Sequence, residues 1–199
     1  MAKDTKQRIL EAALDMFAEN GYVGTNIRVL SASLNLGKSS LYRHFESKEE
    51  IWNAVMEEMS SYYDEHFGST DKLPAIPRDT DELYKMTMRM VDFTVHDEKI
   101  IKCRKLLLTE QFRDEKVRKL ATRYFLEDTE AIFTKVFEEM MKNGSIKKTE
   151  PKVLAFSYTA PITALVHLCD REPEKEPEAM EKLHSFVMQF VAEYGGRNE

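Results

Sequence analysis

Residues 25–50 limit the fold most strongly, because they contain two short helical segments separated by a break. In the first segment, apolar residues recur at the spacing of one helical face, at Ile27, Leu30 and Leu34. Asn35 and Gly37 then interrupt the pattern, and Asn tolerates a positive φ better than most residues that carry a side chain. We therefore expect a two-turn helix capped by the Thr25 hydroxyl, followed by a tight turn at Asn35.

A second helix is expected over residues 38–45, where Leu41 and Phe45 have the spacing of a buried pair. Two helices joined by a tight turn can place the second one in the major groove of DNA while the first braces it. The pattern alone also fits a small helical bundle with an ordinary polar surface. The side chains that can face outward from this second helix are Lys38, Ser39, Ser40, Tyr42, Arg43 and His44.

Helical patterns continue through the rest of the 199-residue chain, which contains only 7 Gly and 6 Pro. We predict an all-α fold of about nine helices, with a helix-turn-helix domain over residues 1–47 and a helical body over residues 48–199. Besides the two segments above, helices are expected at 5–20, 48–67, 80–95, 97–112, 114–143, 149–171 and 177–194.

Several residues mark the ends of these helices. Gly21 is expected to stop the first helix in a left-handed conformation. Capping boxes are predicted at Asp4 with Gln7 and at Ser47 with Glu50, each before an apolar helical run. Residues 69–78 contain Pro74 and Pro77 and are predicted to form a linker.

Charge is distributed unevenly along the chain. The net charge is −6, but residues 1–48 contain seven basic and five acidic residues. That segment is therefore +2 and the remainder is −8. A mildly basic head on an acidic body suits local binding of phosphate.

Other classes of protein find little support in the sequence. No nucleophile with a neighbouring base, glycine-rich phosphate loop or metal-ligand spacing is present, so we expect no enzyme, no catalytic residues, no metal and no cofactor. Cys103 and Cys169 are expected to be buried free thiols. The polar start MAKDTKQR predicts no signal peptide, and the apolar stretch 158–169 is too short to span a bilayer. The chain is expected to be cytoplasmic, without membrane contact.

The order of residues in the first quarter of the chain resembles the DNA-binding domain of the tetracycline-repressor (TetR) family of bacterial regulators. The matching elements are Ala12-Ala13, Phe17, Gly21, Thr25, Leu41-Tyr42-Arg43-His44-Phe45 and Ser47-Lys48-Glu49. Three positions depart from the family pattern: Asn35 and Ser39 stand where Gly is usual, and Gly37 stands where Ser is usual. These departures leave the predicted fold intact and bear on the operator sequence.

The resemblance implies residues that bind double-stranded DNA. We expect Lys38, Ser39 and Arg43 to read bases. Phosphates are expected to be contacted by Thr25, Tyr42, His44 and Lys48, and Ser40 also matches a position that touches DNA in the family. Asn26 and Arg28 lie at the start of the bracing helix, where free backbone N–H groups attract a phosphate.

A homodimer is expected, because one recognition helix binds weakly and two of them 34–36 Å apart can read a palindrome. The family pairs through its last two helices, and both are strongly apolar here. The predicted interface residues are Phe156, Leu165, Leu168, Leu183, Phe186, Val187, Phe190 and Val191.

The body between these parts is rich in Met and aromatic residues, which adapt to varied ligands. For each of these residues taken singly, plain core packing is the commoner role. The candidates to line a cavity are Met59, Tyr63, Phe67, Tyr84, Met88, Val91, Phe93, Cys103, Leu107, Phe112, Tyr124, Phe133, Phe137 and Tyr158.

The resemblance implies a transcriptional regulator, a repressor by default, that binds a palindromic operator as a dimer. A small and largely apolar effector in the body would shift the helix 48–67, separate the two heads and release the DNA. The alternative is a DNA-binding regulator without a small-molecule ligand, either constitutive or controlled by a partner. A packed body would favour the alternative.

Overall fold

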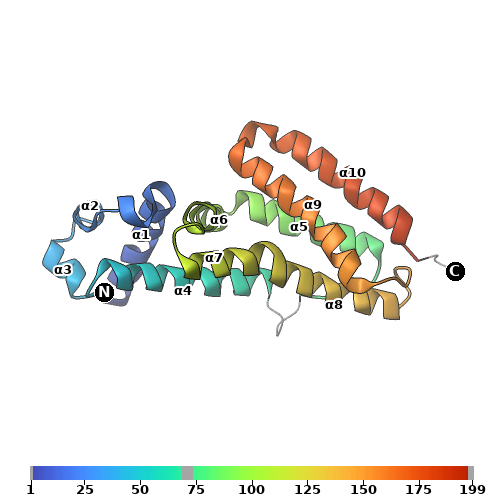
Figure 1. Cartoon of the computed structure of the whole chain (residues 1–199), viewed down its shortest axis with the longest axis horizontal. Helices are drawn as coiled ribbons and strands as arrows, with labels where there is room; N and C mark the ends of the chain where they lie inside the picture. The colour runs from blue at the N-terminus through green and yellow to red at the C-terminus, as the bar shows by residue number, and fades with distance from the viewer. Residues whose placement is uncertain (1, 69–73, 197–199) are drawn as a thin grey trace. The chain divides into compact units, whose positions relative to one another are not determined.

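The computed structural model describes residues 2–68 and 74–196, with side chains from Thr5 onward. Over these residues the chain is helical apart from its turns and one isolated bridge between Ile146 and Gly195. The all-α prediction is therefore confirmed (Figure 1). If the continuous run α7, η1 and α8 is counted once, the described residues form nine α-helices, as predicted.

The chain divides into two compact units, which do not follow the predicted boundary between residues 47 and 48. The first unit comprises Met1–His66 and Glu98–Ala121, and the second comprises Phe67–Asp97 and Thr122–Glu199. The helix-turn-helix thus shares its compact unit with most of α4, with α6 and with most of α7. The boundary at residue 47 remains a prediction about which residues bind DNA.

The described residues of the first unit form six helices, four from the start of the chain and two from its middle. Its α1 is kinked, because Gly21 has φ 69° and ψ 176°, so the helical conformation is interrupted where a left-handed stop is predicted. The predicted cap at Asp4 lies outside the described side chains. The helices of this unit are α1 (Ala2–Gly24), α2 (Ile27–Ser33), α3 (Lys38–Tyr42), α4 (Lys48–Phe67), α6 (Glu98–Glu110) and α7 (Glu115–Thr122).

The core of the first unit joins the helix-turn-helix to α1 and α4. The ring of Phe17 meets the indole of Trp52 edge-on, with centroids 4.9 Å apart. Leu41 and Phe45 are buried as predicted, and they anchor α3 from its inner side. Helix α6 packs along α1, and Lys102 on α6 pairs with Asp15 on α1 at 2.6 Å. The burial of Leu41 and Phe45 thus fixes the orientation of α3 within this unit.

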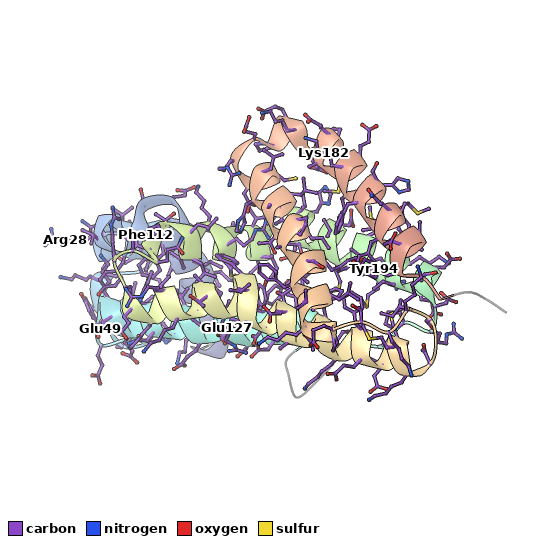
Figure 2. All side chains as sticks on the ribbon, turned by 45° about the vertical axis from the view of Figure 1, so that its right-hand side comes forward. Arg28, Glu49, Phe112, Glu127, Lys182 and Tyr194 are labelled. Atoms are coloured by element: carbon purple, nitrogen blue, oxygen red, sulfur yellow. The ribbon has the colours of Figure 1, made fainter. Side chains whose placement is uncertain are left out.

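The second unit contains the remaining helices. In it α8 packs against α9, and α9 packs against α10 and α5. Helices α9 and α10 run side by side in opposite directions (Figure 1), and the labelled Tyr194 marks the C-terminal end of α10 in Figure 2. The elements are α5 (Thr80–His96), the π-helical turn η1 (Arg123–Glu127), α8 (Asp128–Lys142), α9 (Pro151–Arg171), the 3-10 turn η2 (Pro173–Lys175) and α10 (Glu176–Tyr194).

Two predicted helices differ from those observed. The single helix predicted over residues 114–143 is interrupted by the π-helical turn η1, which no Pro or Gly announces in the sequence. The recognition helix predicted over residues 38–45 ends at Tyr42, and the chain continues as a turn to the buried Phe45. The predicted linker at residues 69–78 falls partly outside the described residues.

Helix α9 is the one described helix whose length and mean hydropathy, 1.3 over its most apolar window, meet the requirement for crossing a membrane. The apolar stretch 158–169 lies within this helix, which the sequence predicts over residues 149–171. Core helices of helical bundles meet the same requirement, and α9 packs against α5, α8 and α10.

Candidate DNA-binding surface

The turn between α2 and α3 has the geometry that the sequence predicts. Asn35 has φ 55°, the one positive φ of a non-glycine residue in the described parts of the chain. The N–H of Leu36 donates to the carbonyl of Ser31 at 2.9 Å, which closes the turn. Gly37 is extended, at φ −67° and ψ 148°, and precedes α3 as its N-cap. The turn therefore redirects the chain within four residues and brings α3 onto α2.

Helix α3 turns its apolar side inward and its polar side outward. Lys38, Ser39, Tyr42 and Arg43 are exposed, whereas Ser40 and His44 are half-buried. The Lys38 ammonium lies 5.5 Å from the centre of the Tyr42 ring. The Arg43 guanidinium donates to Ser40 Oγ at 3.0 Å. The base-reading candidates therefore share one exposed surface with a phosphate-binding candidate, and their donors are within reach of a groove.

The start of α2 differs from the prediction. Asn26, not Thr25, is the N-cap, and its side chain accepts from the N–H of Arg28 at 2.8 Å. Thr25 is only 4% exposed, and its hydroxyl donates to the carbonyls of Gly21 at 2.8 Å and Met16 at 3.1 Å. The predicted Thr25 cap is therefore wrong, because this hydroxyl closes the end of α1 instead.

Thr25 accordingly supports the surface from within, whereas Asn26 and Arg28 are exposed. Figure 2 shows the labelled Arg28 at the outer edge of the first unit.

Lys48 lies at the first position of α4 and is half-buried. Its ammonium lies 4.5 Å from the centre of the Tyr22 ring and donates to the carbonyl of Val23 at 3.4 Å. Burial lowers the pKa of Lys48 from its usual value. The contacts with Tyr22 and Val23 hold this cation against the end of α1.

The capping box before α4 is present in slightly altered form. The N–H of Glu50 donates to Ser47 Oγ at 3.1 Å, as predicted. The Glu50 carboxylate reaches back to the N–H of Glu46 at 2.5 Å, one residue before the cap. Helix α4 has the predicted bounds, so its N-terminus is fixed directly behind the turn that follows α3.

The predicted dimer residues fall into three groups by their exposure in this structure. Leu183, Val187 and Phe190 are buried within the chain's own core, which corrects the prediction for these three residues. Phe156 is 51% exposed, and Val153, one turn earlier on α9, and Met188 on α10 are also exposed. The remaining four candidates are partly buried against the core: Leu165, Leu168, Phe186 and Val191.

The predicted cavity-lining residues are divided between the two units. Met59, Tyr63, Cys103 and Leu107 belong to the first unit, and Phe67 and Phe93, 5.7 Å apart at their ring centres, to the second. Phe112 is 85% exposed in the turn after α6, so the prediction that it lines a cavity is wrong. The others belong to the second unit, where Tyr84 and Met88 are partly buried and the rest are buried: Val91, Tyr124, Phe133, Phe137 and Tyr158.

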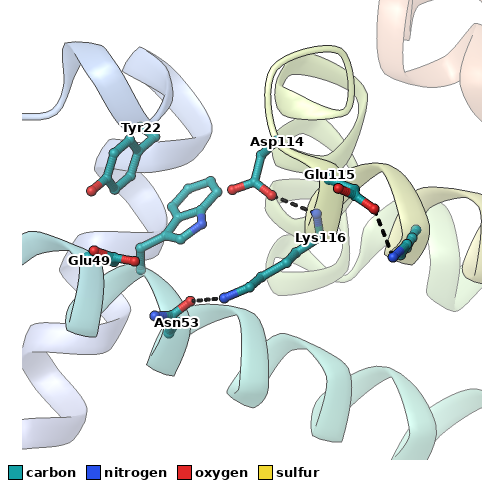
Figure 3. Close-up of a pocket in the computed structure, with 8 residues that line it drawn as sticks. Tyr22, Glu49, Asn53, Asp114, Glu115 and Lys116 are labelled. Atoms are coloured by element: carbon teal, nitrogen blue, oxygen red, sulfur yellow. Dashed lines mark hydrogen bonds and ion pairs between the residues drawn. The ribbon is translucent and has the colours of Figure 1, made fainter.

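Sequence reasoning missed a cavity of about 490 Å³ in the first unit. None of the predicted cavity-lining residues is among its lining residues. The signals available in the sequence were the chain's one tryptophan and the run of charges that begins at Asp114. The cavity is lined by Tyr22, Glu49, Trp52, Asn53, Asp114, Glu115, Lys116 and Lys119 (Figure 3).

Residues 9–55 match the family of bacterial regulatory proteins named after TetR. IcaR of Staphylococcus epidermidis, a negative transcriptional regulator of the biofilm operon icaADBC, is 40% identical over 58 residues. That match covers 29% of this chain and 31% of IcaR, so this chain spans less than a third of that relative. YhgD of Bacillus subtilis, an uncharacterised regulator of the helix-turn-helix type, is 23% identical over 96% of both chains.

Solved structures agree with the observed fold. A TetR transcriptional regulator from Chloroflexus aurantiacus superposes with a TM-score of 0.77 at 18% identity, over 98% of both chains. SmeT, the repressor of a Stenotrophomonas maltophilia multidrug efflux pump, superposes with a TM-score of 0.66 at 19% identity, over 97% of this chain and 91% of SmeT. The relatives are transcriptional regulators rather than enzymes. Residues 9–55 therefore carry the helix-turn-helix domain of the TetR family of bacterial regulatory proteins, and the chain shares its fold with solved TetR regulators.

Proposed function

We propose that this chain is a transcriptional repressor that binds double-stranded DNA through the exposed side of α3. The observation that carries the proposal is the placement of Lys38, Ser39 and Arg43. All three are exposed, and Leu41 anchors their helix into the core. Guanidinium and ammonium groups pair with guanine edges, and hydroxyls pair with bases or phosphates, so this surface can read sequence.

The positioning contacts come from the flanks of the same surface. Tyr42 ends α3, and His44 and Lys48 follow it in the chain; Asn26 caps α2, and Arg28 lies in its first turn. Hydroxyl, imidazole and ammonium groups of this kind fix the register of a protein on the phosphate backbone. The buried Thr25 acts indirectly in this proposal, by holding the end of α1 against the start of α2.

We further propose that the chain binds its operator as a homodimer. Helix α9 is uncharged from Val153 to Cys169, and it exposes Val153 and Phe156. Exposed apolar side chains on an uncharged helix suit the centre of an interface between subunits. Two recognition helices related by a two-fold axis require an inverted repeat with half-sites about 34–36 Å apart, or a multiple of a helical turn.

Selection of bound sequences from a random DNA pool tests this proposal. The selected sequences are expected to contain an inverted repeat, and each selected DNA site is expected to bind two subunits. Selection of a single half-site bound by one subunit contradicts the dimer. Failure to enrich any sequence, with the protein folded, contradicts sequence-specific binding.

We also propose that a small-molecule effector controls DNA binding by this chain. SmeT, whose fold this chain shares, has been solved in complex with triclosan, which supports a small-molecule effector for this chain. In the second unit Tyr84 and Met88 are only partly buried, and Met side chains adapt to varied ligands. An effector bound there would release the DNA if it favours a separation of the two heads that does not match the operator.

The packing of the second unit favours the other candidate, a regulator without a small-molecule ligand. Tyr158 is fully buried, and its ring centre lies 4.5 Å from that of Phe190, 5.3 Å from Phe133 and 5.4 Å from Phe137. A ligand among these rings would have to displace them, and close-packed cores resist such insertion.

A titration of the protein–DNA complex with a panel of small apolar compounds separates the two candidates. Release of the DNA at a saturating concentration, with a matching rise in the melting temperature of the free protein, supports the effector. Complexes that persist against the whole panel, without any rise in melting temperature, support regulation without a ligand.

A further inference from the structure

The cavity of the first unit has an aromatic wall formed by Trp52 and Tyr22 (Figure 3). Their ring centres are 5.0 Å apart, and Phe17 supports Trp52 from the core side. Trp52 is only 3% exposed, so the wall is held rigidly. The Lys48 ammonium already lies 4.5 Å from the centre of the Tyr22 ring. The contact of Lys48 with Tyr22 shows that an aromatic ring of this wall attracts a cation, and the part of Trp52 that lines the cavity is of the same chemical kind.

Carboxylates surround the wall. Asp114 accepts from the N–H groups of Lys116 at 2.7 Å and Val117 at 3.2 Å, and so caps α7. Glu115 is neutralised by Lys119 at 2.9 Å. The pKa of Tyr22 is raised, first by burial and then by the charges of Glu49 and Asp114. Both carboxylates thus impose a negative potential on the aromatic wall.

An ammonium group of the chain itself lies in this cavity. Lys116 extends from α7 toward α4, and its Nζ donates to the side-chain oxygen of Asn53 at 3.3 Å (Figure 3). An amide oxygen is a neutral acceptor, and the bond is long, so this contact holds the lysine loosely. Lys116 is an exposed residue, so its side chain has room to leave this position. The position of its Nζ marks where a cation is accepted.

We propose that this cavity binds a small organic cation, such as a quaternary or primary alkylammonium ion, in place of the Lys116 ammonium. The ligand's cationic group takes the position beside Asn53 Oδ1, between the Trp52 face and the Glu49 and Asp114 carboxylates. The volume of about 490 Å³ suits a molecule of this size. The site lies within the unit that carries the helix-turn-helix, and it does not depend on an effector in the second unit or on repression.

Trp52 provides a direct test, because it is the one tryptophan in the sequence and forms the wall of the cavity. The full-length protein is titrated with choline chloride, with tetramethylammonium chloride and, at equal ionic strength, with sodium chloride. Trp fluorescence and calorimetry are recorded together. Both organic cations are expected to give a saturable change, and sodium chloride is not.

Variants at the rim of the cavity complete the test without disturbing its buried wall. Glu49→Gln is expected to weaken binding of the cation about tenfold, because it removes a charged partner. Lys116→Gln is expected to strengthen binding, because it removes the competing ammonium. Glu57→Gln, exposed on α4 and not part of the lining, is the matched control and is expected to bind as the natural chain does.

The proposal is overturned if neither organic cation gives a saturable signal. It is equally overturned if Glu49→Gln and Glu57→Gln bind with the same affinity, or if sodium benzoate competes with choline. Circular dichroism of each variant confirms that the helices are intact, so loss of binding is read on folded protein.

Discussion

The hydroxyls of Thr87 and Tyr158 lie 2.6 Å apart in the core of the second unit, and they join α5 to α9. Thr87 Oγ1 also donates to the carbonyl of Leu83 at 2.9 Å. A threonine hydroxyl has one hydrogen, so Tyr158 is the donor in the pair. Burial raises the pKa of Tyr158 well above its ordinary value, and the phenol stays protonated throughout the neutral range. This is a fixed polar contact inside an otherwise apolar cluster.

Substitution of either partner is expected to have unequal effects on stability. Thr87→Val keeps the shape but leaves the buried Tyr158 hydroxyl without an acceptor, at a cost of about 1–3 kcal/mol in the free energy of unfolding. Tyr158→Phe leaves Thr87 bonded to Leu83 and is expected to cost about 1 kcal/mol. The double variant should cost less than the sum of the two, as measured by urea denaturation. Additive costs would contradict the pairing.

Gly21 is required by its conformation and by its neighbour. Its φ is 69°, and a Cβ on it would lie 2.4 Å from Glu110 Oε1, a carboxylate on a residue that is 2% exposed. Gly144 has a similar φ of 80° with no heavy atom within 4 Å of such a Cβ. Both Gly→Ala variants are expected to lose about 1–2 kcal/mol in the free energy of unfolding because of the left-handed conformation. Gly21→Ala is expected to lose more, because Glu110 must move. Urea denaturation that ranks the two equally would contradict the close approach of Glu110 to Gly21.

Lys48 is expected to contact a DNA phosphate from the start of α4. Lys48→Ala should therefore reduce the slope of log affinity against log salt concentration by about one per subunit. Lys85→Ala, an exposed lysine on α5 in the second unit, is the control and should leave the slope unchanged. Fluorescence anisotropy of a selected DNA site over a range of salt concentrations measures both. An unaltered slope in Lys48→Ala removes Lys48 from the list of phosphate contacts.

Phe156 is expected to lie in the dimer interface. Phe156→Glu places a charge on the uncharged face of α9 and should convert the dimer to monomer while the subunit stays folded. Sedimentation velocity measures the assembly state, and circular dichroism measures the helix content. Lys85→Glu serves as the control and should remain dimeric. A dimeric Phe156→Glu protein would place the interface elsewhere.

Local signals in the sequence were sufficient for the helix-turn-helix. The positive φ of Asn35, the Gly37 cap, the Ser47–Glu50 bond and the bounds of α4 all follow from contacts within a few residues. The Thr25 cap failed because this hydroxyl donates to two carbonyls of α1, while the side chain of Asn26 caps α2. Two local roles competed, and the sequence does not rank them.

Contacts between segments that are distant along the chain could not be predicted from the sequence. The cavity beside Trp52 forms because residues 114–119 pack next to the start of α4, more than sixty residues away along the chain. The sequence likewise could not distinguish the core side of α10 from a dimer interface. Leu183, Val187 and Phe190 are buried in the chain's own core, but their helical spacing would suit either role. The π-helical turn at Arg123–Glu127 has no signature in its residue types.

Sequence reading by α3 is tested most directly by a ratio of two affinities, that for a selected operator and that for a scrambled duplex. The variant Lys38→Ala/Arg43→Ala leaves Leu41 and Phe45 in the core, so it is expected to fold normally. Loss of two base contacts should reduce the ratio by about tenfold or more. An undiminished ratio in the folded double variant would contradict the account.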